Sequence, residues 1–164
     1  MAYHSPNFFT AHAGEPPASN YATLDSRNNH PVIDHDDTTD ESMYFTGFLG
    51  NDYAGNGLTA LIGWMASTAT SGNVVWNLAI ERNEDEGTDL DSDSFASAQA
   101  ATAAAPSTSG ALQYTSIAFT SGAQMDSVVA GESFRAKLTR NASNGSDTMS
   151  GDAEVKFLAI YETP

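Results

Sequence analysis

The stretch that decides the fold reads QMDSVVAGE (residues 124–132), SFRAKLTR (133–140), a polar loop, and then AEVKFLAIY (153–161). The first piece predicts a single helical turn that ends at a corner around Gly131. The second and third pieces alternate apolar and polar residues, which is typical of strands with one buried face. A turn, a corner and two alternating strands joined by a polar loop indicate the closing part of an antiparallel β-sandwich.

The preceding chain alternates strand-like runs with turns rich in Gly, Asn, Asp and Ser. Trp64 and Trp76 lie on the apolar faces of two such runs, so we expect both in the core. The run FASAQAATAAA (95–105) has high helix propensity, but it alternates small and polar residues between strands, and a strand is favoured. The expected strands cover residues 31–34, 43–49, 58–66, 74–82, 95–105, 112–119, 133–140 and 153–162. This pattern predicts an all-β fold, an eight-stranded antiparallel jelly-roll sandwich with an extended N-terminal arm.

The arm comprises residues 1–28, and the jelly-roll domain comprises residues 29–164. Three prolines and the lack of any sustained period predict an extended or irregular arm. Phe8 and Phe9 form an adjacent apolar pair that would gain from being covered. Two placements are open: the arm docks on a neighbouring subunit or another protein, or it folds back over its own sandwich.

Composition narrows the possible partners and chemistry. With 164 residues the chain is one domain by length. Its 21 acidic and 6 basic residues give a net charge of −15, which disfavours binding to nucleic acid or to an anionic membrane. The absence of cysteine excludes disulfides and thiolate chemistry. No signal peptide or long apolar run is visible, so we expect synthesis in a cytoplasm without targeting.

Two acidic segments, residues 34–41 and 84–93, are the only candidate metal ligands of note. Either could contribute carboxylates to Ca²⁺ or form solvated turns, and both readings stay open. Asp89, Asp91 and Asp93 have alternate spacing, but the rest of an EF-hand loop is missing. No histidine pair fits zinc, and no Gly-x-Ser-x-Gly motif is present. We therefore expect no enzyme activity, no catalytic residues, no cofactor and no specific metal.

Aromatic residues are the candidates for recognition of a partner. A sugar-stacking platform could be built from Trp64, Trp76, Tyr44, Tyr53, Tyr114 and Tyr161. The two tryptophans fit the core better, whereas Tyr53 lies in a Gly-rich loop with Asn56 and is expected to be exposed. In the arm, Phe8, Phe9 and Tyr21 are the expected anchors to a partner.

Three segments carry a resemblance to a known family. They read LDSRNNHPVIDHDDTTD (24–40), GAQMDSVVAGESFRAKLTRN (122–141) and GSDTMSGDAEV (145–155), with the two tryptophan strands between them. Together they resemble jelly-roll domains of tailed-phage virion proteins over about residues 24–162. Such domains occur in capsid cement (decoration) proteins and in tail-fibre heads.

The resemblance implies a structural virion protein of a bacteriophage that binds the outer capsid surface at subunit junctions and stabilises the shell. Its partners would be the major capsid protein and itself, as a homotrimer, with no nucleic acid and no membrane. After synthesis in the host cytoplasm it would lie on the outer surface of the virion. The alternative is a tail-fibre or receptor-binding module that recognises a host surface glycan, with Tyr53 and Asn56 in contact.

Overall fold

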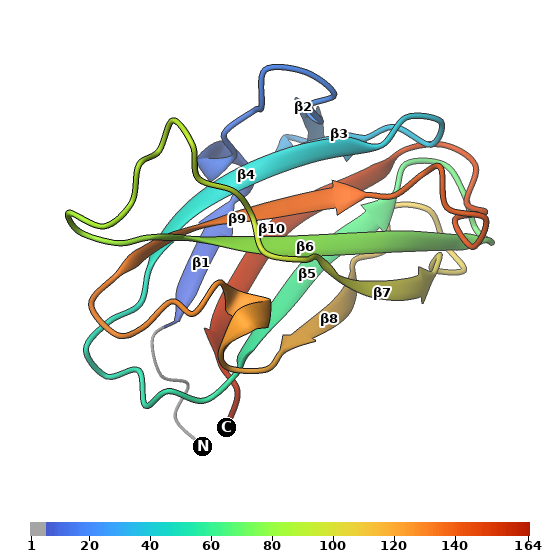
Figure 1. Cartoon of the computed structure of the whole chain (residues 1–164). Coiled ribbons are helices and arrows are strands. Elements are labelled where there is room, and N and C mark those ends of the chain that lie inside the picture. Colours follow the sequence, from blue (N-terminus) through green and yellow to red (C-terminus); the bar gives the residue numbers. More distant parts are fainter. Residues whose placement is uncertain (1–5) are drawn as a thin grey trace.

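The computed structural model describes residues 6–164, which form two antiparallel β-sheets packed face to face (Figure 1). Sheet A has the order β2-β3-β10-β5-β8, with β1 also paired to β10, and sheet B has the order β4-β9-β6-β7. Sheet A contains β1 (Asn7–Thr10), β2 (Thr23–Arg27), β3 (His30–His35), β5 (Leu58–Ala66), β8 (Gln113–Phe119) and β10 (Ala153–Glu162). Sheet B contains β4 (Glu41–Phe48), β6 (Asn73–Asn83), β7 (Gln99–Ala104) and β9 (Ser133–Arg140).

The prediction of an all-β, two-sheet antiparallel sandwich is confirmed, although residues 6–164 contain ten strands where eight were expected. Two single-turn 3-10 helices, η1 (Ala11–Ala13) and η2 (Ala123–Met125), accompany them, and η2 overlaps the start of the predicted helical turn. The Ala-rich run is a strand over β7, because pairing with β6 overrides its helix propensity. No helix in this part of the chain is long and apolar enough to cross a membrane.

The core lies between the sheets and is centred on the two tryptophans. Trp64 of β5 and Trp76 of β6 are fully buried and meet edge to face, with ring centroids 5.8 Å apart. Trp64 Nε1 donates a hydrogen bond of 2.8 Å to Thr115 Oγ1 on β8, so its polar atom is satisfied inside the core. The predicted core faces of β5 and β6 are therefore correct.

The arm folds over its own sandwich, which is the second of the two placements that the sequence allows. β1 pairs with β10 and β2 pairs with β3, so both belong to sheet A. Between them, Glu15 and Tyr44 exchange backbone hydrogen bonds of 2.8 and 2.9 Å, which attach the arm to the edge of β4 in sheet B. The arm of residues 7–27 thus contacts both sheets and covers the β4 edge.

Segment 84–98, between β6 and β7, crosses the outer face of sheet B (Figure 1). Its return toward β7 is fixed where the Ala96 N–H donates a 2.9 Å hydrogen bond to the Ile80 carbonyl of β6. This crossing places Phe95 over the sheet, with its ring centroid 5.3 Å from that of Tyr44. Sheet B is thus bordered by the arm at its β4 edge, and segment 84–98 covers part of its outer face.

Candidate functional site

The outer face of sheet B contains a groove of about 470 Å³, which we call the sheet B groove. Strands β4 and β9 form its floor, arm residues 17–20 form one wall, and Asp40 lies at one end. The lining residues are Pro17, Ala18, Ser19, Asn20, Asp40, Ser42, Tyr44, Lys137 and Thr139. Most of these carry hydrogen-bonding groups, and Tyr44 supplies the aromatic ring.

The floor follows from the period of two in both strands. Met43 and Phe45 of β4 enter the core, so Ser42 and Tyr44 face outward. Sheet pairing sets Ser42 opposite Thr139 and Tyr44 opposite Lys137 on β9. Ser42 Oγ and Thr139 Oγ1 lie 2.7 Å apart and are hydrogen-bonded. Cross-strand register thus gathers two hydroxyls, one ring and one ammonium group into a single patch.

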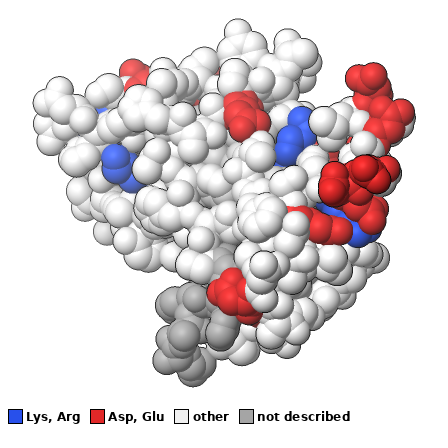
Figure 2. Space-filling view, turned by 90° about the vertical axis from the view of Figure 1, so that its left-hand side faces the viewer, with Lys and Arg blue, Asp and Glu red and all other residues white. Residues whose placement is uncertain are grey.

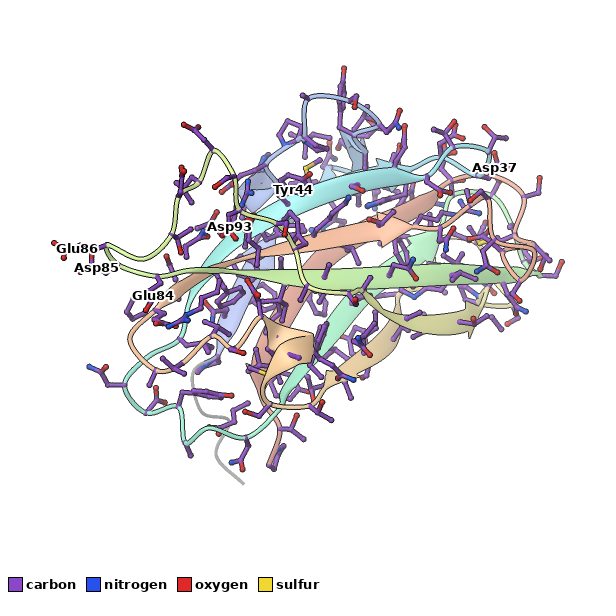
Figure 3. All side chains as sticks on the ribbon, viewed as in Figure 1. Asp37, Tyr44, Glu84, Asp85, Glu86 and Asp93 are labelled. Carbon is purple, nitrogen blue, oxygen red and sulfur yellow. The ribbon has the colours of Figure 1, made fainter. Side chains whose placement is uncertain are left out.

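The ring of Tyr44 is held from one side. The Arg135 guanidinium carbon lies 5.3 Å from the ring centroids of both Tyr44 and Phe95. Arg135 is ion-paired with Glu81, which is buried, and this hydrogen bond raises the pKa of Arg135. A permanently charged, fixed guanidinium therefore positions the two rings. Figure 3 shows Tyr44 on β4 and Asp93 of segment 84–98 to its left in the view.

Lys137 is the cation of the groove floor. Within residues 6–164 its ammonium group has no ion pair and no hydrogen-bond acceptor in the protein. Its three N–H donors are available to a ligand in the groove. The groove therefore places hydrogen-bond donors, hydrogen-bond acceptors and one aromatic ring close together.

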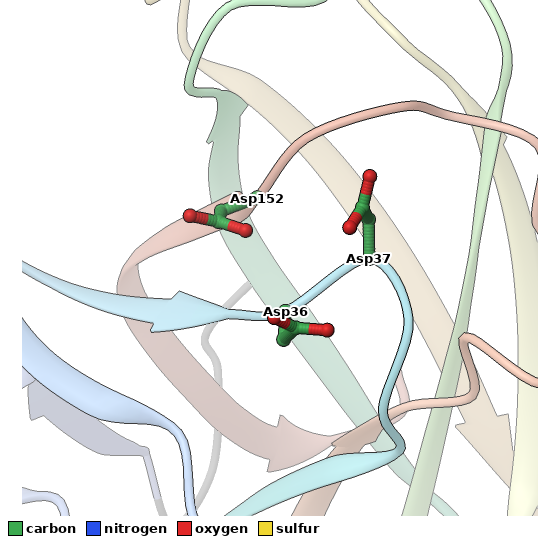
Figure 4. A group of neighbouring side chains, drawn as sticks. All are labelled: Asp36, Asp37 and Asp152. Carbon is green, nitrogen blue, oxygen red and sulfur yellow. The ribbon is translucent and has the colours of Figure 1, made fainter.

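Acidic residues also gather at both ends of the molecule. At one end, Asp36, Asp37 and Asp152 bring carboxylate oxygens within 4.8 Å of one another, from two loops that Figure 4 shows converging. Asp36 Oδ1 accepts hydrogen bonds from the N–H groups of Thr38 (2.6 Å) and Thr39 (2.9 Å), and the Thr38 hydroxyl and N–H lower the pKa of Asp36. The three carboxylates could contribute to a hard-cation site, but part of their capacity is used by the loops themselves.

At the other end, Glu84, Asp85 and Glu86 lie at the tip of segment 84–98 (Figure 3). This end faces the viewer in Figure 2, where acidic side chains gather at one side of a largely uncharged face. Within this segment the Asp89 side chain accepts a 3.1 Å hydrogen bond from the Asp91 N–H. Such a hydrogen bond between an Asp side chain and the N–H two residues on is typical of a turn-forming loop.

The residues expected to act as arm anchors have different environments. Phe8 is 64% exposed on the outer face of sheet A, whereas Phe9 points into the core, with its ring centroid 5.4 Å from that of Phe45. Alternation along β1 causes this split. Tyr21 is half-exposed beside the β4 edge, where its segment bridges to Ser42.

The expectation that Tyr53 is exposed is wrong, because its side chain is only 7% exposed and belongs to the core. The Gly-rich loop folds back on itself, and the Tyr53 hydroxyl donates to the Asn56 carbonyl. Asn56 is exposed, but its N–H is committed to Glu162 Oε1 at 3.0 Å. The loop is therefore held by internal hydrogen bonds, and these two residues do not form one exposed surface.

The sequence did not predict Lys137, Ser42 and Thr139 as residues of one binding site. Alternation shows that each faces outward, and this signal is available from the sequence. The pairing of β4 with β9, almost a hundred residues apart, brings them together, and the sequence alone does not contain it.

No family model and no curated protein matches the sequence. The fold is similar to that of a CBM36 domain of a multidomain xylanase from the hindgut metagenome of Trinervitermes trinervoides, with a TM-score of 0.56 and 11% identity over 97% of this chain and 98% of that one. It is also similar to a family 35 carbohydrate-binding module from an environmental isolate (TM-score 0.55, 12% identity, 96% and 97% covered). A CBM22 xylan-binding domain from Paenibacillus barcinonensis gives a TM-score of 0.55 at 14% identity, with 96% and 99% covered.

These similarities correct the functional reading drawn from the sequence. They contradict the interpretation of the chain as a capsid cement protein, because the structures with this fold are carbohydrate-binding modules. The physical reason is that a jelly-roll sandwich serves many functions, so strand pattern and acidity do not separate one from another.

Proposed function

We propose that this chain is a non-catalytic glycan-binding module and that its ligand lies in the sheet B groove. The observation that carries the proposal is the lining of that groove, where the Tyr44 ring is accompanied by hydroxyl and ammonium groups on the floor and by the Asn20 amide in the wall. A sugar ring has the complementary character, because its faces present C–H groups and its edge presents hydroxyls.

The parts of the groove match these two aspects of a sugar. The Tyr44 ring offers an apolar surface for a C–H face. Lys137 supplies donors, and Asn20 and Thr139 supply both donors and acceptors. Asp40 lies at the end of the groove, where its carboxylate already accepts hydrogen bonds from the N–H and hydroxyl of Ser143. A volume of about 470 Å³ is within the range of small-molecule sites. A net charge of −15 repels polyanions, so the expected ligand is a neutral glycan.

The structural neighbours support the proposal at the level of the fold. The three similar structures named above are carbohydrate-binding modules, a class of non-catalytic domains, and the one from Paenibacillus barcinonensis is a xylan-binding domain. Xylan is therefore the first probe to use, with other neutral polysaccharides beside it.

Calorimetric titration with xylohexaose and affinity electrophoresis in soluble xylan and laminarin test the proposal. Tyr44→Ala should weaken binding at least about fivefold, because stacking on an aromatic ring, taken at the value for nucleic-acid bases, contributes on the order of 1–3 kcal/mol. Tyr44→Phe keeps the ring and should retain most of the affinity. Leu90→Ala, at an exposed apolar residue of segment 84–98, is the matched control and should bind like the wild type.

The proposal fails if the wild-type protein binds none of these glycans and none on a broad array of neutral glycans. It also fails if Tyr44→Ala and Lys137→Ala both bind every recognised glycan with unchanged affinity. A circular-dichroism melt of each variant separates lost binding from lost folding.

A further inference from the structure

The outer face of sheet A presents three aromatic rings, which we call the sheet A row: Phe8 of β1, Phe157 of β10 and Tyr114 of β8. Phe8 stacks on Phe157 with centroids 5.0 Å apart and planes 26° apart. Tyr114 meets Phe157 edge to face, with centroids 5.5 Å apart. The outer two rings are strongly exposed, Phe8 at 64% and Tyr114 at 60%. The sheet B groove uses none of these residues.

Sheet pairing builds the row from neighbouring strands that lie behind sheet B in Figure 1. Phe157 pairs with Gly63 of β5, and Gly63 pairs with Tyr114. A Cβ atom at Gly63 would lie 2.2 Å from Phe157 Cε1, so the Phe157 ring rests directly on the glycine backbone. Because Gly63 has no side chain, the Phe157 ring lies close to the sheet and contacts both exposed rings.

A pocket of about 330 Å³ lies beside the row on the same face. Its lining residues Met65, Leu112 and Lys156 lie one or two positions along the strands from Gly63, Tyr114 and Phe157. The remaining lining residues are Arg27, Asn28, His30 and Gly110. Arg27 is fixed by a 2.7 Å ion pair with Glu154, and Lys156 Nζ lies 3.4 Å from the Pro31 carbonyl.

We infer that the sheet A row and this pocket form a second glycan-binding site. The rings offer an apolar platform about two sugar rings long, and the pocket offers nitrogen donors for hydroxyl groups at one end of it. Because the row and the groove lie on the outer faces of opposite sheets, one molecule could bind two glycan chains at once. This inference stands whether or not the sheet B groove binds sugar.

A glycan fits this face better than a second copy of the chain. At about 200 Å² for a whole aromatic side chain, the exposed parts of Phe8 and Tyr114 amount to roughly 250 Å². A stable protein interface covers about 800 Å² on each partner. Each copy also carries a net charge of −15, so two copies repel one another. A neutral ligand that is narrow and amphipathic meets neither obstacle.

Depletion binding to insoluble xylan and to microcrystalline cellulose tests the inference with the full chain. Five proteins are compared: wild type, Phe8→Ala/Tyr114→Ala, Tyr44→Ala, a triple variant that combines these three changes, and Leu90→Ala as control. The double variant Phe8→Ala/Tyr114→Ala, which we call the row variant, should bind at least one of these solids at least about tenfold more weakly than the wild type. If the sheet B groove also binds sugar, the wild type should cross-link soluble xylan, seen as turbidity, and the row variant should not.

Unchanged binding to both solids by the row variant would overturn the inference, as would failure of the wild type to bind either solid. A wild-type dimer that becomes a monomer in the row variant, measured by light scattering, would also overturn it, because the row would then be a self-association surface. If Tyr44→Ala binds both solids normally while the row variant does not, this inference stands, and the groove is then judged by the titrations of Tyr44→Ala and Lys137→Ala described above. Nitrogen-15 NMR of the wild type with xylohexaose gives an independent readout: the amide signals of Gly63 and Tyr114 should shift.

Discussion

The buried ion pair between Arg140 and Asp147 gives a sharp prediction for stability. Arg140 is 0% exposed, and its Nη2 lies 2.9 Å from Asp147 Oδ1, a carboxylate that is itself only 2% exposed. The guanidinium also donates to the carbonyls of Met149 at 2.7 Å and Gly151 at 2.8 Å. Asp147→Ala would leave this charge buried with carbonyl partners alone.

The expected cost follows from these contacts. Breaking a buried pair by removing one partner costs about 3–5 kcal/mol. Asp147 Oδ2 also accepts a 3.0 Å hydrogen bond from the Val75 N–H, and an orphaned buried N–H costs about 1–3 kcal/mol. The two losses overlap, so we expect Asp147→Ala to lower the free energy of unfolding by about 4 kcal/mol. Asp147→Asn keeps the shape and an acceptor, and should cost about 2 kcal/mol.

Urea denaturation at pH 7, followed by circular dichroism, measures both variants against Asp91→Ala. Asp91 is an exposed loop carboxylate, so its removal should change stability by less than about 0.5 kcal/mol. The urea slopes must agree for the midpoints to be compared. A loss below about 1 kcal/mol for Asp147→Ala would refute the reasoning, since it would mean that Arg140 finds water or another anion when its partner is gone.

Two further predictions concern pH and backbone conformation. Burial, followed by repulsion from Glu154 and Asp25, raises the pKa of Asp34 to about 7, so the folded state holds this proton more tightly than the unfolded state. The contribution of Asp34 to stability should therefore fall between about pH 4 and pH 7 and level off above, so the melting temperature of Asp34→Asn should rise relative to that of the wild type over this range; parallel curves for the two proteins would contradict this. Gly131 has φ +85°, so Gly131→Ala should cost about 1–2 kcal/mol in urea denaturation, whereas an unchanged midpoint would show that the corner relaxes.

Much of the sandwich could be predicted because its strands carry their own signal. β5 was predicted over 58–66 from the alternation of apolar residues that ends at Trp64, and it has those bounds. β2 was missed because TLDSR has no buried face to produce a pattern; it pairs only at the margin of sheet A. Tyr53 was misplaced because a Gly-rich loop has no period from which burial can be read.

The binding surfaces were harder to predict than the strands. The groove depends on the register between β4 and β9, and the sheet A row depends on pairing among β1, β10, β5 and β8. Such non-local pairings leave no trace in local alternation. The interpretation as a capsid protein rested on the predicted fold, and the similarity to carbohydrate-binding modules contradicts it. The homotrimer and the virion location stay predictions.

The position of β10 has a consequence for how the protein is made. This strand occupies residues 153–162, yet it lies inside sheet A, between β5 on one side and both β3 and β1 on the other. As the chain leaves the ribosome, the partners of β10 emerge first and must wait with unpaired edges until its last residues are synthesised. Sheet A is therefore expected to assemble after translation of this segment, slowly and in one late step, as contacts of long sequence separation require.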